Sequence, residues 1–474
     1  RARRRAAATA PALADDPELT GRWLNGGLPF ALTGDQARAV ETVAGELAAT
    51  RPMQRLLMGE VGSGKTVIAL YAMLRAAEHG RQAVLMAPTE TLAEQHFAAI
   101  QRLIGAENVT LALLTGSTPA TRRTDILAKL ASGELAVAVG THALIEPGVA
   151  FAALAVAVVD EQHRFGVRQR AALDAKAPPG LVPHVLHMTA TPIPRTLALC
   201  RHGDLDQTRL RELPVGRQPI DTHLVGGERE RARAYERIRE ELRRGRQAFV
   251  VCPLVDEAAE VESWGGEAGR PAGGLEEARA ATVEYERLAA GEFADFRIVL
   301  LHGQMHHRDK QAAMAAFAGG QADVLVATTV IEVGIDVPNA TVMVVENAER
   351  FGISQLHQLR GRVGRGEHRS LCLLFGPKSS PRLRALVDHA DGFALAEIDL
   401  ALRREGELIG TRQSGLSQFR TARLPEDGEL LERARRWAEL VIEADPGLAE
   451  PEHRLLADAL AAALGDEAER PIAA

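Results

Sequence analysis

The chain has 474 residues, which is enough for two or three domains that each bury their own core. Hydrophobic residues make up 46% and charged residues 25%, as in an ordinary soluble protein. The formal net charge of −7 argues against a broadly basic surface, but it leaves open binding to nucleic acid through a local patch.

The three cysteines, Cys200, Cys252 and Cys372, lie far apart and form no C-x-x-C pair. We therefore expect neither a disulfide framework nor a cysteine zinc site, and we expect a reducing cytoplasm. No apolar run reaches membrane-spanning length, so we expect no membrane partner. The chain opens at Arg1 in a basic run without an initiator Met, and we expect a fragment whose N-terminal part is missing.

Residues 1–27 combine a basic start with Pro11 and two glycines, as in a linker or helix that leads in from an upstream part. Thr33 suits the N-cap of a helix over residues 37–47. Gln36 lies just inside that helix, shortly before a phosphate-loop motif. Its amide can read the adenine edge by donating and accepting together, and a solvated helix residue is the equal alternative.

Residues 59–66 fill the phosphate-loop template G-x-x-x-x-G-K-[ST]. A short apolar strand at 55–58 precedes the loop, and a helix over 67–74 follows it, with its positive dipole end toward the phosphates. Lys65 would reach the β- and γ-phosphates, and the Thr66 hydroxyl would hold Mg²⁺. The alternative is a glycine-rich turn, and the strand before the loop and the helix after it make that interpretation the weaker one. The predicted ATP contacts are Gly59, Glu60, Val61, Gly62, Ser63, Gly64, Lys65 and Thr66.

Apolar runs at 83–87, 109–114, 136–142 and 154–160 alternate with amphipathic helices. This alternation predicts a parallel sheet that is buried on both faces. Ligands of such sheets bind at the carboxyl ends of the strands. Thr89, Gly116, Thr141 and Asp160 follow the strands at that edge.

Asp160 and Glu161 end one of these strands. An Asp there, downstream of a phosphate loop, is the expected partner of Mg²⁺, and Glu161 can polarise the attacking water. A solvated turn is the alternative for an isolated Asp-Glu pair. Thr189 and Thr191 end a further strand beside the same edge, where they could report the nucleotide state or simply mark the strand's exit.

A connector at 214–219 leads into a second alternation, with strands expected at 248–253, 298–303, 324–329 and 341–346 and a flexible insertion at 263–274. This half has no phosphate loop. Residues 355–366 instead carry three arginines with interleaved glycines, which can approach polyphosphate closely. We expect Arg362 and Arg365 to act as arginine fingers, and the alternative is a basic loop that faces nucleic acid or solvent.

Residues 59–66, 87–96, 160–167 and 188–197 resemble the first-domain motifs of superfamily 2 helicases, and residues 330–340 and 355–366 resemble those of the second domain. The resemblance is narrower still to the RecG branch-migration helicases, without their N-terminal wedge domain. It implies an α/β fold of two tandem RecA-like P-loop domains with parallel sheets and a small, mainly helical C-terminal translocation domain. The implied limits are 1–27 for a lead-in, 28–213 and 214–384 for the two motor domains, and 385–474 for the translocation region.

The resemblance also implies roles for particular residues. Gln358 would help to order the attacking water, and His163, Thr189 and Thr191 would couple the nucleotide state to DNA. Thr411, Arg412 and Gln413 belong to a block that resembles the translocation element. Just before it, residues 403–407 depart from the family's Arg-Gly-Pro-Gly-Glu.

The implied activity is ATP- and Mg²⁺-dependent translocation on duplex DNA, with branch migration of Holliday junctions and regression of stalled forks. Implied partners are branched DNA and single-strand binding protein, and the motor would be a monomer in the bacterial cytoplasm, at the nucleoid. The transcription-repair coupling factor shares most motifs, but residues 62–64, 251–255 and 332–334 look closer to RecG. The alternative function from another class is a nucleotide-gated switch that hydrolyses little ATP. Glu161 argues against it, because a pure switch does not need a positioned base. The hypothesis that the chain is a structural scaffold is weaker still.

Overall fold

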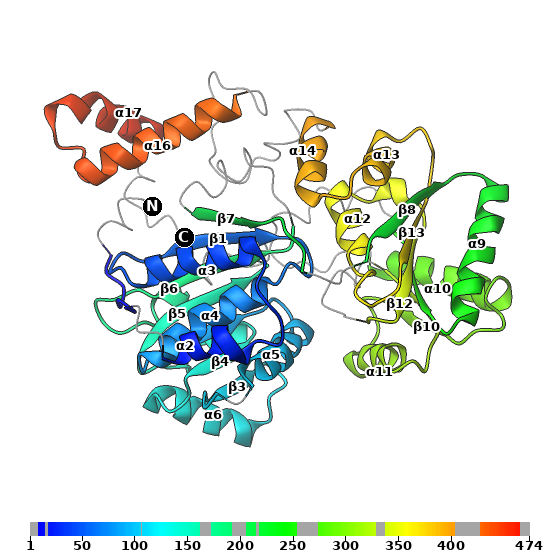
Figure 1. The fold of residues 1–474 in the computed structure, drawn as a ribbon, viewed down its shortest axis with the longest axis horizontal. Helices are drawn as coiled ribbons and strands as arrows, with labels where there is room; N and C mark the ends of the chain where they lie inside the picture. The colour runs from blue at the N-terminus through cyan, green and yellow to red at the C-terminus, as the bar shows by residue number, and fades with distance from the viewer. Residues whose placement is uncertain are drawn as a thin grey trace. The chain divides into compact units, whose positions relative to one another are not determined.

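A computed structural model of the chain describes residues 8–14, 18–105, 107–161, 172–191, 205–214, 218–253, 274–328, 337–402 and 427–464. The chain divides into two compact units, one formed by Arg1–Pro214 with Glu426–Ala474 and the other by Val215–Pro425. Each unit is built on one sheet in which every described strand pairing is parallel (Figure 1).

The sheet of the first unit has the strand order β3-β4-β2-β5-β6-β1-β7. Its strands are β1 (Gln54–Gly59), β2 (Gln82–Met86), β3 (Leu111–Leu114), β4 (Val137–Gly140), β5 (Leu154–Asp160), β6 (His184–Thr189) and β7 (Asp206–Leu210). Its helices are α2 (Leu19–Arg22), α3 (Gly34–Leu47), α4 (Lys65–Glu78), α5 (Glu90–Ile104), α6 (Ala120–Ser132), α16 (Gly428–Ala444) and α17 (Arg454–Leu464), with short turns η1 (Trp23–Gly27), η2 (His142–Ile145) and η6 (Pro451–His453).

Apolar side chains bury both faces of this sheet. Side chains of α3, α4 and α5 form one core, and α6, η2 and the opposite strand faces form another. Every residue of β5 is buried, as expected for a strand that is covered on both sides. The parallel sheet predicted from the apolar runs is therefore confirmed. Thr33 is also confirmed as a helix cap, because it forms a capping box with Gln36 at the start of α3.

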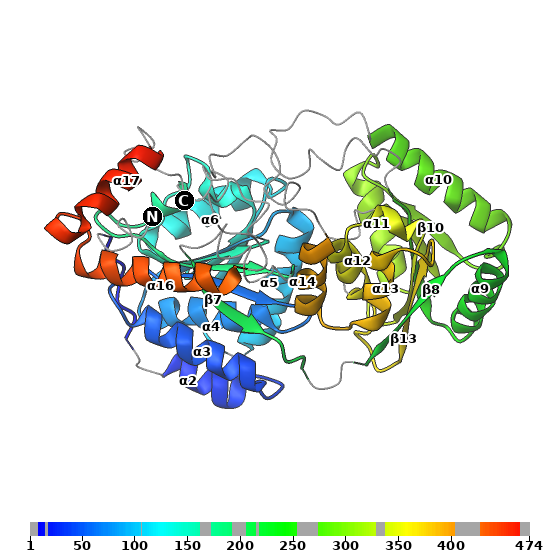
Figure 2. The same cartoon turned by 90° about the horizontal axis from the view of Figure 1, so that it is seen from above.

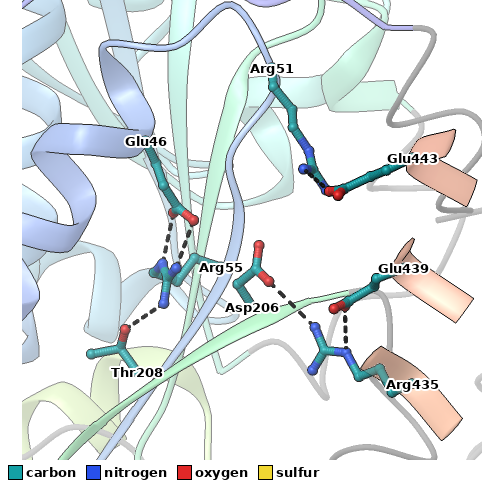
Figure 3. Close-up of polar contacts among 8 residues, drawn as sticks. All are labelled: Glu46, Arg51, Arg55, Asp206, Thr208, Arg435, Glu439 and Glu443. Carbon is teal, nitrogen blue, oxygen red and sulfur yellow. Dashed lines mark hydrogen bonds and ion pairs between the residues drawn. The ribbon is translucent and has the colours of Figure 1, made fainter. Parts of the chain in front are cut away.

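Strand β7 was not predicted. Its sequence, Asp-Gln-Thr-Arg-Leu, is polar because β7 lies at the sheet edge and four of its five residues are only partly buried. One contact that holds it is Arg55 on β1, which pairs with Glu46 at 2.6 Å and donates to the Thr208 hydroxyl at 2.7 Å (Figure 3). Polar cross-strand contacts thus replace the apolar pattern that identifies an inner strand.

The sheet of the second unit has the order β10-β11-β9-β12-β13-β8. Its strands are β8 (Ile220–Val225), β9 (Gln247–Val251), β10 (Ile298–Leu301), β11 (Val324–Ala327), β12 (Ala340–Val345) and β13 (Ser370–Phe375). Its helices are α9 (Glu228–Arg243), α10 (Gly274–Ala290), α11 (His307–Ala318), α12 (Ile353–Arg360), α13 (Pro381–Asp388) and α14 (Gly392–Leu402), with the short turn η5 (Ala348–Arg350). Two apolar clusters cover its two faces, so the second predicted sheet is confirmed as well.

The N-terminal residues 8–14 pack onto the first unit through His184. The Met53 N–H donates to His184 Nδ1 at 3.1 Å, and His184 Nε2 lies 2.8 Å from the Pro11 carbonyl, to which it donates. An amide can only donate to Nδ1, so the buried ring is neutral with its proton on Nε2. Burial lowers the pKa of His184 below its ordinary value of 6.5.

We therefore expect the free energy of unfolding to fall as the pH decreases below about 6.5, because the unfolded chain then binds a proton that the folded ring excludes. Urea unfolding at about pH 7.5 and about pH 5.5 checks this for the wild type and for His184→Gln. The wild type should lose more stability on acidification than the variant, which has no titrating ring. Equal losses would contradict the expectation.

Helix α16 lies against the first unit beside β7 (Figure 2). Arg435 pairs with Asp206 at 3.4 Å and with Glu439 of its own helix at 2.8 Å, and Glu443 pairs with Arg51 at 3.1 Å (Figure 3). No residue of α16 is buried. These ion pairs link the helix to Asp206 of β7 and to Arg51, which precedes β1. No helix in the described part of the chain is long and apolar enough to cross a membrane.

Candidate active site

The phosphate-loop motif lies between β1, which ends at Gly59, and α4, which begins at Lys65. Gly64 caps α4 with a φ of 83°, a left-handed conformation that favours glycine. A Cβ at Gly59 would collide with the Ser63 hydroxyl, and one at Gly64 would collide with the Gln36 amide. The predicted order of strand, glycine loop and helix is confirmed, and the close packing explains why glycine is needed at these two positions.

Lys65 points back into its own loop. Its Nζ donates to the carbonyl oxygens of Gly59 at 2.7 Å and Glu60 at 2.9 Å. These bonds hold the ammonium group at the mouth of the loop, where α4 begins and its dipole favours negative charge. The arrangement suits a polyphosphate, and the phosphate-binding role of residues 59–66 stays a prediction.

The side chain of Gln36 is 1% exposed, and both ends of its amide bond to the protein. Its Oε1 accepts from the Thr33 N–H at 2.9 Å, and its Nε2 donates to the Ser63 carbonyl at 2.9 Å. Gln36 therefore ties α3 to the phosphate loop. Reading adenine with this amide requires that one of the two bonds be exchanged for a bond to the base, and that role stays a prediction.

Asp160 ends β5 at the carboxyl edge of the sheet, opposite Met188 of β6, and Met58 of β1 lies opposite Thr189. The phosphate loop, Asp160 and Thr189 therefore share one sheet edge. Asp160 Oδ2 accepts a hydrogen bond from His96 Nε2 at 2.7 Å. Burial alone would raise the pKa of Asp160, but His96 and the nearby charge of Lys65 hold it below its usual value, so the group is a carboxylate at neutral pH.

Glu161 follows with a φ of 49°, a strained value for a residue with a side chain. Its Oε1 accepts from the Ala190 N–H at 3.4 Å. Ala190 stands between Thr189 and Thr191, and the Thr191 N–H donates to the Thr189 hydroxyl at 3.1 Å. Glu161 is thus bonded to the residue that stands between the two threonines, at the edge of the sheet.

The arginine-rich stretch of the second unit follows α12. Arg360 is buried and donates to the carbonyl oxygens of Leu386, His389 and Ala390 at 2.8–2.9 Å. It therefore closes the end of α13, which is a structural role. Arg362 is 7% exposed, Arg365 and Gln358 are partly buried, and Arg365 Nε donates to the Gly361 carbonyl at 3.2 Å.

The glycines of this stretch serve packing. Gly364 has a φ of 77°, and a Cβ there would lie 2.9 Å from the Ile220 side chain. A Cβ at Gly366 would collide with the Pro338 carbonyl. These contacts inside the unit give a packing reason for the two glycines, and the interpretation that they let the loop approach a polyphosphate stays a prediction. The finger roles of Arg362 and Arg365 stay predictions.

Four of the predicted coupling residues lie outside the described residues, namely His163, Thr411, Arg412 and Gln413. Two residues that the sequence did not single out do have clear contacts. His96 bonds to Asp160, and Asp35 Oδ2 accepts from the backbone N–H groups of Arg211 and Glu212 at 2.7 and 2.9 Å. Asp35 thereby ties the start of α3 to the segment that leaves the first unit. Both contacts join residues far apart in the chain, so spacing could not reveal them.

Thr66 and Asp160 offer a hydroxyl and a carboxylate, and Mg²⁺ prefers such oxygen ligands. The described residues contain no group of three or more His, Cys, Asp or Glu side chains that could hold a metal by themselves. Mg²⁺ is usually bound by one or two protein oxygens, which Thr66 and Asp160 could supply, together with water and substrate phosphates. The donor set therefore fits the ion.

Two parallel α/β units, a phosphate loop and an Asp-Glu pair at one sheet edge define the class of P-loop motors with tandem RecA-like units. Family models agree. That of the DEAD/DEAH box helicases matches residues 33–199, the helicase conserved C-terminal domain matches 233–367, and the C-terminal part of domain 3 of the ATP-dependent DNA helicase RecG matches 389–464. The chain belongs to the RecG family.

Individual relatives agree with this family. The chain is 50% identical over 449 residues to the ATP-dependent DNA helicase RecG of Mycobacterium tuberculosis, with 89% of this chain and 59% of the relative covered. It is 43% identical to that of Bacillus subtilis over 438 residues, with 91% and 61% covered. A solved structure of RecG bound to a three-way DNA junction matches with a TM-score of 0.72 and 39% identity, over 90% of this chain and 53% of that one. The chain thus spans 53–61% of these three relatives.

Proposed function

We propose that this chain is the ATP-hydrolysing motor of a RecG-type helicase and that it translocates on duplex DNA. In the whole protein, the motor drives branch migration of Holliday junctions and regression of stalled replication forks. The observation that carries the proposal is the shared sheet edge of Lys65, Asp160 and Glu161, in a chain 39% identical to a RecG that was solved on a three-way DNA junction.

In this proposal ATP and Mg²⁺ are the cofactors. Residues 59–66 hold the phosphates through backbone N–H groups and Lys65, and Gln36 reads adenine. Thr66 and Asp160 hold the Mg²⁺ ion, which neutralises phosphate charge when it is bound. Glu161 takes the proton of the attacking water. Its strained backbone and the Ala190 N–H fix the direction of that carboxylate.

In this proposal the second unit supplies the positive charge of two arginines to the transferred phosphate. Arg362 and Arg365 bring guanidinium groups to the transferred phosphate, and Gln358 helps to order the water. Support comes from Arg360, whose guanidinium is bonded to three backbone carbonyls and so has a structural role, and the finger roles are therefore assigned to Arg362 and Arg365.

Thr189 and Thr191 couple the nucleotide state to DNA, because both adjoin the amide that bonds to Glu161. His163 belongs to the same coupling, and Thr411, Arg412 and Gln413 transmit it to DNA translocation. The proposed limits of the parts remain 1–27, 28–213, 214–384 and 385–474. The proposed partners are branched DNA and single-strand binding protein, and the motor acts as a monomer at the bacterial nucleoid in the cytoplasm.

The deciding experiment measures ATP hydrolysis by this chain without DNA, with plain duplex and with a synthetic fork, and measures ATP binding in parallel. We expect duplex DNA to stimulate hydrolysis strongly. Hydrolysis that stays low on every DNA while ATP binds would overturn the claim that this chain alone is a DNA-driven motor. Absence of ATP binding would overturn the whole proposal.

A further inference from the structure

One polar contact of the candidate site has no role in the proposed mechanism. His96 Nε2 lies 2.7 Å from Asp160 Oδ2, and the two side chains are 14% and 10% exposed. A carboxylate can only accept, so His96 donates this hydrogen bond. The contact joins α5 to the end of β5, and 64 residues separate the two partners.

The position of His96 on its helix is unusual. Ala93, Ile100 and Ile104 are the buried residues of α5, and His96 stands three residues after the first and four before the second. This spacing places it on the core-facing stripe of the helix, where an apolar side chain is ordinary. A histidine on that stripe needs a polar partner, and Asp160 is the partner that it has.

Helix α5 is firmly placed. Thr89 caps its first turn by accepting from the Leu92 N–H at 3.3 Å, and Glu90 Oε1 accepts from the Ser117 N–H at 3.0 Å. The buried residues of α5 belong to the core that also contains α4. The helix that carries His96 is thus fixed at its first turn and against the core.

We propose that His96 is a positioning residue of the metal site, because its hydrogen bond holds the Asp160 carboxylate in the orientation in which that group takes Mg²⁺. The inference rests on the proposed role of Asp160. Carboxylates that bind metals are themselves hydrogen-bonded by a second layer of residues, and loss of such a partner typically weakens metal binding about 10- to 100-fold. The competing idea is that His96 blocks Asp160 and must leave before the ion binds.

The test follows binding of a fluorescent ATP analogue while Mg²⁺ is titrated, with wild type, His96→Ala and His96→Gln. For His96→Ala we expect the half-saturating Mg²⁺ concentration to rise about 10- to 100-fold, and the affinity for the analogue in EDTA to stay unchanged. Glutamine can donate from its amide, so His96→Gln should restore a large part of the Mg²⁺ affinity. Circular dichroism checks that each variant is folded.

His79→Ala is the matched control, because His79 is also partly buried and bonds to the Arg75 carbonyl at 2.9 Å on the neighbouring helix α4. Its Mg²⁺ dependence should equal that of the wild type. An unchanged Mg²⁺ requirement in His96→Ala would overturn the inference, and a lower one would establish competition instead. If the wild type does not bind the analogue with or without Mg²⁺, the proposed function has failed rather than this inference.

Discussion

ATP hydrolysis should fall about 10³- to 10⁵-fold when Arg365 is replaced by alanine, while ATP binding stays close to that of the wild type. The reason is that an arginine finger acts on the charge that develops in the transition state, so its loss lowers turnover more than affinity. Arg365 is partly buried and its Nε donates to the Gly361 carbonyl, and circular dichroism checks that the alanine variant is folded. Steady-state hydrolysis and equilibrium ATP binding measure the two effects.

The matched control is Arg369→Ala in the same segment. Arg369 is 71% exposed and pairs with Asp221 at the surface at 3.1 Å, so its removal takes away an equal charge without touching the proposed finger. Hydrolysis by this control should be close to that of the wild type. Arg362 is more deeply buried, and Arg362→Lys is the safer variant there, because lysine keeps the charge but loses the planar fork. Equal rates for Arg365→Ala and the control would rule out the finger.

Glu161→Gln should lower ATP hydrolysis about 10²- to 10⁴-fold and leave ATP binding intact, because the amide cannot take the proton of the attacking water. Glutamine has the same shape, and its carbonyl oxygen can still accept from the Ala190 N–H, so the local structure is preserved. Single-turnover hydrolysis, measured beside ATP binding, separates the chemical step from product release.

The control for this change is Glu134→Gln, which removes an exposed carboxylate before β4 and away from the sheet's carboxyl edge. Its rate should match that of the wild type. Turnover that is unchanged in Glu161→Gln would contradict the assignment of the base. It would also remove the main argument against a nucleotide-gated switch.

The inner strands could be predicted from the sequence because burial on both faces makes them continuously apolar. The run at 154–160 coincides with β5, and the short strand before the phosphate loop coincides with β1. Strands β7 and β8 were not predicted. Each lies at a sheet edge and keeps polar residues, such as Asp206 and Asp221, that hide the strand pattern. Strand β13 was not predicted either, although residues 370–375 carry the apolar run that is typical of an inner strand.

For the candidate site, motif spacing located the phosphate loop and the Asp-Glu pair, because both are contiguous in the chain. Spacing could not find the bond between His96 and Asp160 or the clamp of Asp35 on Arg211 and Glu212, since each depends on how distant segments pack. It also could not separate Arg360, whose guanidinium is bonded to backbone carbonyls, from its two neighbours. Identical side chains in one motif differ here only in what surrounds them.

The way α16 is held against the first unit makes its position depend on ionic strength. Two charge pairs link it to the rest of the unit, Arg435 with Asp206 of β7 and Glu443 with Arg51 before β1, and no residue of the helix is buried. An exposed pair such as Arg51 with Glu443 contributes about 0–1 kcal/mol, and the pair of Arg435 with Asp206 is partly buried. The distance over which such charges act shrinks from about 10 Å at 0.1 M salt to about 3 Å at 1 M. We therefore expect the docked population of α16 to fall as the salt concentration rises.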